Sequence, residues 1–96
     1  MKNTIEFKIQ FTKPLNHKTF KEMDVSLMQH LKDEGFELAY TACEMPKNDE
    51  EKYTGANYEI CFAHDMDRPM RMDVKRAIYE AFKKEGFYWR ESVEWS

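Results

Sequence analysis

Lys32-Asp33-Glu34-Gly35-Phe36 is a charged segment with a glycine and an aromatic residue at its end, and it occurs again 51 positions later as Lys83-Lys84-Glu85-Gly86-Phe87. Glycine suits the position just past a helix because it lacks Cβ and can adopt a left-handed backbone conformation. Each copy therefore predicts the end of a helix, followed by an aromatic residue that begins a strand.

The repeat extends beyond these two segments. The same offset aligns Asn16 with Asp67, and both residue types are good helix N-caps. It also aligns apolar positions: Phe7, Ile9 and Phe11 with Tyr58, Ile60 and Phe62, and Met23, Leu27 and Leu31 with Val74, Ile78 and Phe82. Two copies are too few for a solenoid. We therefore expect a single domain, 1–96, with a pseudo-repeat spanning 4–44 and 55–95.

Hydrophobic periodicity predicts four strands and two helices. Alternation of apolar and polar residues indicates strands at 4–12, 36–43, 54–63 and 87–95. Helical periodicity follows the two caps, over 17–34 and 68–85. In the second strand we expect Leu38, Tyr40 and Ala42 to point inward. Residues 45–53 are expected to form an acidic hairpin loop.

The predicted order of elements is β-α-β-β-α-β. A right-handed crossover in each half interleaves the two halves into one antiparallel sheet with both helices on one face. Over the whole chain this pattern resembles the ferredoxin-like superfold, which implies an α+β sandwich with a four-stranded antiparallel sheet. Because that superfold carries many unrelated activities, the resemblance assigns no function.

Composition favours a soluble globular protein. Of the 96 residues, 42% are hydrophobic and 15% aromatic, with only three glycines and three prolines, which argues against disorder. The net charge of −3 argues against a general nucleic-acid-binding protein. No segment is as long as a membrane span, and the start of the chain lacks the apolar core of a signal peptide. We therefore expect a cytoplasmic protein with reduced cysteines.

One face of the predicted sheet is not covered by helices. The strand register places there a candidate partner-binding surface: Ala39, Thr41, Cys43, Glu59, Cys61 and Arg90. The two central strands offer no aromatic ring on this face for base stacking, so RNA binding there is not favoured. Its small and mixed side chains suit back-to-back packing of two sheets in a homodimer, and they equally suit a solvated face. Cys43 and Cys61 are expected to be too far apart for a disulfide.

Charge is divided unevenly along the chain. Residues 1–67 contain eight Lys or Arg and 13 Asp or Glu, whereas residues 68–90 contain seven and three. Arg68, Arg71 and Lys75 share one face of the second helix near its N-terminus, which makes them a candidate site for phosphate, nucleic acid or an acidic partner. An ordinary solvated face is the alternative interpretation. The acidic loop residues are a candidate contact for a basic partner: Glu44, Asp49, Glu50 and Glu51.

The chain has no recognisable catalytic or cofactor motif. His64, Asp65 and Asp67 precede the second helix and could ligate a divalent metal. However, Asp67 is needed as a helix cap, and no His-x-x-x-His or Cys-x-x-Cys pair supports a metal site. We therefore expect no catalytic residue, no metal and no cofactor.

The sequence thus predicts a small non-catalytic binding or regulatory protein that acts through protein–protein contacts, such as an inhibitor or adaptor from a mobile element. A homodimer is expected. The first alternative is nucleic-acid or phosphate binding through the basic helix 68–85. The second is a small metal-dependent enzyme that uses the loop His64–Asp67.

Overall fold

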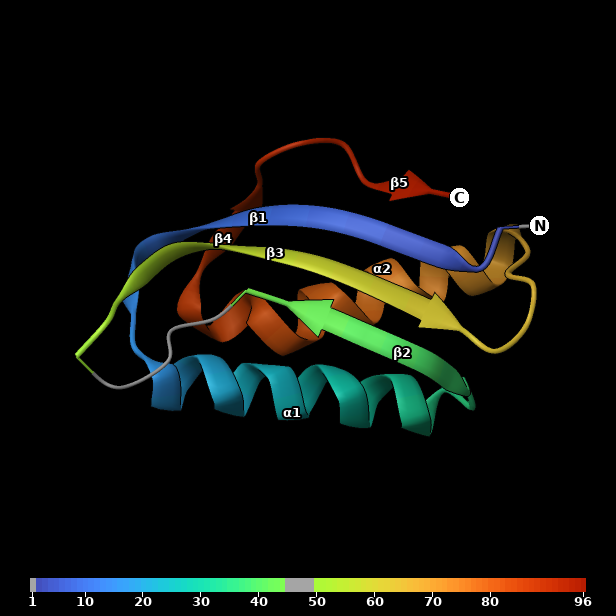
Figure 1. Ribbon diagram of the computed structural model, residues 1–96, viewed down its shortest axis with the longest axis horizontal. Helices are drawn as coiled ribbons and strands as arrows, with labels where there is room; N and C mark the ends of the chain where they lie inside the picture. The colour runs from blue at the N-terminus through green and yellow to red at the C-terminus, as the bar shows by residue number, and fades with distance from the viewer. Residues whose placement is uncertain (1, 45–49) are drawn as a thin grey trace.

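Two α-helices pack on one face of a five-stranded antiparallel sheet (Figure 1). The computed structural model describes residues 2–44 and 50–96. The elements are β1 (Thr4–Leu15), α1 (His17–Asp33), β2 (Leu38–Cys43), β3 (Tyr53–Phe62), α2 (Arg68–Phe82), the 3₁₀ turn η1 (Lys83–Glu85), β4 (Phe87–Trp89) and β5 (Glu94–Trp95). The strand order is β2-β3-β1-β4, and β5 also pairs with β1. The expected α+β class is confirmed, with one strand more than predicted.

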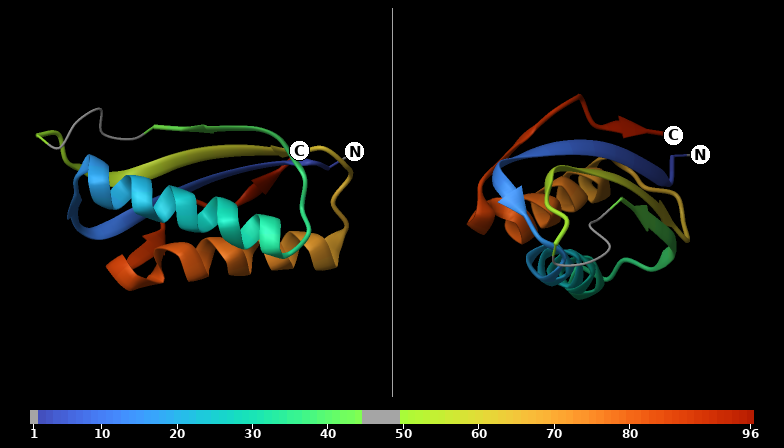
Figure 2. Two further views of the ribbon diagram at one scale, coloured as in Figure 1. Left: turned by 90° about the horizontal axis from the view of Figure 1, so that it is seen from below. Right: turned by 60° about the vertical axis from the view of Figure 1, so that its left-hand side comes forward.

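Both helices begin at the predicted caps. The Asn16 side chain accepts a hydrogen bond from the Thr19 backbone N–H, and the Asp67 side chain accepts one from Met70, each at 3.0 Å. The two helices contact each other as well as the sheet, and Figure 2 shows them side by side beneath it. Neither helix in the described part of the chain is long and apolar enough to cross a membrane.

The two glycines of the repeated segment end their helices differently. After α1, Gly35 N–H donates to Lys32 at 2.9 Å and Phe36 N–H donates to Leu31 at 3.0 Å. These two bonds form a Schellman motif, which satisfies carbonyl groups at the helix end. After α2, η1 intervenes, and Gly86 N–H donates to Lys83 at 3.1 Å. Both glycines have positive φ, 86° and 76° respectively.

Replacing each of these glycines by alanine is expected to destabilise the protein to a different extent. A Cβ at Gly35 has no neighbour within 4 Å, whereas one at Gly86 lies 2.9 Å from the Thr12 hydroxyl oxygen. We expect Gly35→Ala to cost about 1 kcal/mol, from backbone strain alone. Gly86→Ala should cost about 2 kcal/mol, because the clash adds to that strain. Urea unfolding of the two variants measures the difference, and equal losses would contradict it.

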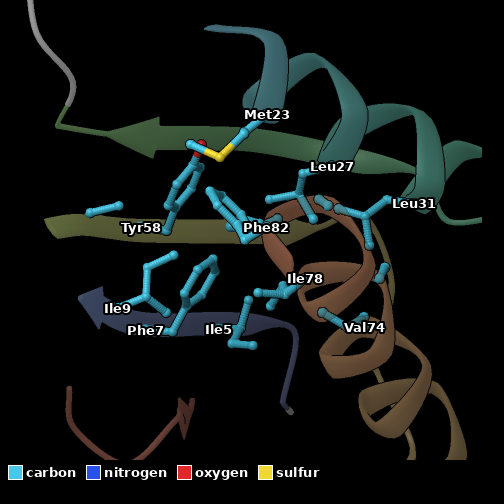
Figure 3. Packing of buried hydrophobic residues seen from close by; sticks show 14 of the residues in the cluster. Ile5, Phe7, Ile9, Met23, Leu27, Leu31, Tyr58, Val74, Ile78 and Phe82 are labelled. Atoms are coloured by element: carbon cyan, nitrogen blue, oxygen red, sulfur yellow. The ribbon is translucent and has the colours of Figure 1, made fainter. Parts of the chain in front are cut away.

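The apolar face of the sheet and the inner stripes of both helices form a single core (Figure 3). Its largest fully buried side chains include Phe20, Phe62 and Phe82. The Phe82 ring lies 6.0 Å from that of Phe11 and 5.9 Å from that of Tyr58, centroid to centroid. The aligned apolar positions of the repeat are therefore core positions, as the sequence predicts.

Strand β1 is longer than predicted. It continues past Pro14 to Leu15, which pairs with Tyr53. Proline has no N–H for a ladder hydrogen bond, and it is tolerated in strands where pairing is irregular. The register between β1 and β3 shifts between Gln10 and Leu15, so Pro14 falls within the irregular interval.

The predicted register of the second strand is wrong beyond Leu38. Leu38 pairs with Phe62, but Tyr40 pairs with Cys61, so two residues of β2 oppose one of β3. Such a bulge reverses the face of every later side chain. Thr41, opposite the buried Ile60, and Cys43, opposite Tyr58, therefore lie on the helix-facing side.

The predicted last strand is divided in two. Trp89 opposes Ile9 and Glu94 opposes Glu6, so five steps along this segment correspond to three along β1. The two excess residues leave the sheet between β4 and β5, where Figure 1 shows the chain rising above β1. Because the excess is even, Trp95 returns to the core-facing side opposite Ile5, and its ring stacks on Phe62 at 6.1 Å.

Candidate protein-binding face

The sheet face opposite the helices carries mostly polar side chains. Glu59 and Cys61 of β3 lie on it, as predicted, because their strand neighbours Tyr58, Ile60 and Phe62 are buried. The bulge in β2 adds Tyr40, which is 45% exposed and opposes Cys61. We call this surface the open face.

Three glutamates form a row across the open face. Glu6 of β1 directly opposes Glu59 of β3 on one side and Glu94 of β5 on the other. Directly opposed residues of antiparallel strands have Cβ atoms about 4.5–5.5 Å apart, and like charges in such pairs destabilise the sheet. The row therefore concentrates negative charge at the centre of the sheet.

A hollow of about 410 Å³ covers this row. Its floor is the open face of β1 and β3, and the segment after β4 contributes Glu91, Ser92 and Glu94 to its lining. Five of the lining residues are glutamates and only one is a cation: Glu6, Glu44, Glu59, Glu91, Glu94 and Lys8. The hollow is thus acidic on several sides.

Three weak interactions lie within the hollow and at its border. Lys8 Nζ lies 3.5 Å from Glu91, and both side chains are about half exposed. Asn57 donates to the Glu44 carboxylate at 3.4 Å. Desolvation and a hydrogen bond with the Glu59 carboxylate raise the pKa of the Tyr40 hydroxyl. With five glutamates and one lysine, the lining of the hollow keeps an excess of negative charge.

Only part of the predicted partner-binding surface lies on the open face. Ala39 occupies the bulge, while Thr41 and Cys43 lie on the opposite side, as described above. Arg90 follows β4, is exposed, and donates its backbone N–H to Lys8 at 2.9 Å. The pairing of Glu6 with Glu94 depends on the two excess residues before β5, so the sequence alone does not predict the row.

Cys43 belongs to a polar cluster between β2, β3 and α1. The Tyr58 hydroxyl donates to Asp24 Oδ1 at 2.7 Å. Burial raises the pKa of the Cys43 thiol to about 12, although its interaction with Tyr58 opposes the change. Burial also raises the pKa of Tyr58, strengthened by the nearby Cys43 and Asp24. A thiol that stays protonated is a poor nucleophile, so this cluster supports packing rather than catalysis. Cys43 and Cys61 are both free and lie on opposite faces of the sheet, contrary to the prediction.

The basic residues of α2 do not line the acidic hollow, although Lys75 lines a neighbouring pocket together with Glu91 and Ser92. Arg68 is exposed in the first turn, Arg71 is half-buried, and Lys75 Nζ lies 5.5 Å from the centroid of the Trp89 ring. Asp67 occupies the N-terminus of this helix, where its carboxylate accepts the Met70 N–H. A negative charge at that position disfavours an additional anion.

The residues of the loop before α2 have structural contacts. Asp65 accepts a hydrogen bond from the Lys2 backbone N–H at 2.7 Å, and His64 Nδ1 lies 3.1 Å from the Asp65 carbonyl oxygen. Among residues 2–44 and 50–96, no group of three or more His, Cys, Asp or Glu side chains is placed to hold a metal ion.

The predicted acidic loop is described only in part. Glu44 lines the hollow, and Glu50 and Glu51 precede β3. Asp49 lies outside the described residues. Of this group, Glu44 is therefore the residue that joins the open face.

No protein-family model and no curated protein sequence matches the chain.

Proposed function

We propose that this protein is a small binding protein that acts through protein–protein contacts and that its open face receives a basic segment of the partner. The observation that carries the proposal is the row formed by Glu59, Glu6 and Glu94 under a hollow lined by two further glutamates. Charged residues that face each other across an interface set partner choice and association rate. Arginine or lysine side chains of a partner would neutralise this row.

The same charge pattern argues against back-to-back dimerisation through the open face. Two copies packed in this way would bring one set of five glutamates against another. Juxtaposition of like charges in an interface costs several kcal/mol. A basic partner of different sequence fits this face better than a second copy does.

The proposal includes a fold assignment. We propose that the chain is a variant of the ferredoxin-like superfold in which the last strand is divided. The strand order β2-β3-β1-β4, with two crossover helices on one face, supports it. The division of the last strand forms one wall of the hollow and so distinguishes this variant.

The test is a titration of the protein with a short peptide of alternating arginine and glycine, followed by NMR at low salt. We expect amide shifts to concentrate at Glu6, Glu59 and Glu94 and binding to weaken as salt is added. The double variant Glu6→Gln/Glu59→Gln should raise the dissociation constant about 10-fold or more.

The matched control is Glu22→Gln/Asp33→Asn, which removes the same amount of charge from the exposed side of α1. It should weaken binding much less than the open-face variant. Shifts spread evenly over the molecule, or equal losses in the two variants, would reject the open face as the binding surface.

A further inference from the structure

The two edges of the sheet differ in how they are protected. At one edge, β4 and β5 contain only three and two residues, and the exposed charged residues Arg90 and Glu91 lie between them. Short strands and charges are the usual means by which edges avoid pairing with other chains. At the other edge, β2 is six residues long, from Leu38 to Cys43, and contains no charged residue and no proline.

The free side of β2 has backbone groups available for a further strand. Glu44 N–H donates to the Asn57 carbonyl of β3 at 3.2 Å. Hydrogen bonding alternates along an antiparallel strand, so the backbone groups of Ala42 and Tyr40 also face β3, whereas those of Thr41 and Cys43 point away from it. Within the described chain, β2 has no neighbour on that side.

We infer that the β2 edge pairs with β2 of a second copy of this chain, antiparallel and about a two-fold axis near Thr41. Thr41 then opposes Thr41 of the second copy, and the two residues exchange both backbone hydrogen bonds. In this register Tyr40 opposes Ala42, and Glu44 opposes Leu38. No glutamate opposes another, so the charges that flank β2 do not prevent the pairing.

A second copy fits this edge better than a charged peptide does. A strand without charges offers no side-chain complement to a charged peptide, but it pairs with itself without repulsion. The proposed pairing of two β2 strands is compatible with the binding of a basic partner to the open face, and it does not depend on that proposal. A two-fold axis perpendicular to the sheet leaves both acidic hollows exposed on the same side of the dimer.

The experiment measures the oligomeric state and the amide exchange of the wild-type chain together. Light scattering across a range of concentrations should show a reversible monomer–dimer equilibrium. Hydrogen exchange at the Thr41 and Cys43 amides should slow as the protein concentration rises. Exchange at Ala42, whose amide already faces β3, should change much less.

The variant Thr41→Lys places two like charges opposite each other in the proposed pairing, and it should raise the dimer dissociation constant about 10-fold or more. The matched control Met72→Lys adds the same charge at a position on α2 that is 62% exposed, and it should leave the constant within about 2-fold. A monomer at every concentration with fast exchange at Thr41, or a dimer that both variants weaken equally, would overturn the inference.

Discussion

Replacing Phe82 by alanine is expected to lower the free energy of unfolding by about 3–5 kcal/mol. The Phe82 side chain is fully buried at the end of α2. Its ring lies about 6 Å from those of Phe11, Tyr58 and Phe87, which come from three different strands. The cavity left by its removal would lie between α2 and the sheet (Figure 3), where the surrounding backbone cannot easily close it. A loss of this size approaches the whole stability of many small domains.

The measurement is urea unfolding followed by circular dichroism. Met72→Ala on the same helix serves as the control, because Met72 is 62% exposed and its truncation should change stability by less than about 0.5 kcal/mol. If Phe82→Ala lost less than about 1.5 kcal/mol, the ring would not hold the helix against the sheet as the structure places it.

Much of this arrangement follows from local sequence signals. The caps Asn16 and Asp67 and the two positive-φ glycines mark the helix ends, and the aligned apolar positions mark the core. These features depend on residues close together in the chain, so periodicity and capping chemistry are sufficient to predict them. The adjacency of β1 and β3 then follows from two crossovers of the same hand.

The open face depends instead on how strands align with each other, and the sequence does not encode that alignment locally. Between Leu38 and Cys43, either set of alternate side chains could face the core. The bulge before Tyr40 determines which set does. A shift of one residue transfers all later side chains to the other face, so sequence alternation alone predicts the wrong face for Thr41 and Cys43.

The acidic hollow depends on two irregularities of the sheet rather than on any motif. Glu94 opposes Glu6 only because two residues leave the sheet after β4. Glu44, which follows β2, reaches the hollow only because the bulge shifts the register of β2 by one residue. The irregular parts of the sheet therefore build the candidate surface, while the regular repeat builds the scaffold. Irregularities that re-aim side chains are typical of functional positions in sheets.

Replacing Tyr58 by phenylalanine is expected to have opposite effects on stability at neutral and alkaline pH. At pH 7 the variant loses the hydrogen bond to Asp24, which joins β3 to α1 at 2.7 Å, and it should be less stable by about 1–2 kcal/mol. Burial raises the pKa of the wild-type hydroxyl above its ordinary value of 10.0. Below that value both the folded and the unfolded chain hold the proton, so the stabilisation is fully present.

Above pH 10 the unfolded chain releases the Tyr58 proton while the folded chain retains it. Wild-type stability should therefore decline through this group as the pH rises above 10, because the unfolded chain then holds one proton fewer than the folded chain. The Cys43 thiol, whose pKa burial raises from 9.0 to about 12, adds a decline that begins near pH 9 in both proteins. Because Tyr58→Phe lacks one of the two groups, its unfolding free energy should fall less steeply and cross that of the wild type at high pH.

Urea unfolding at intervals from pH 7 to pH 12 tests this prediction. The control is Tyr88→Phe, which removes an exposed hydroxyl. Parallel curves for Tyr58→Phe and the wild type would show that the Tyr58 hydroxyl is not held protonated by the folded protein.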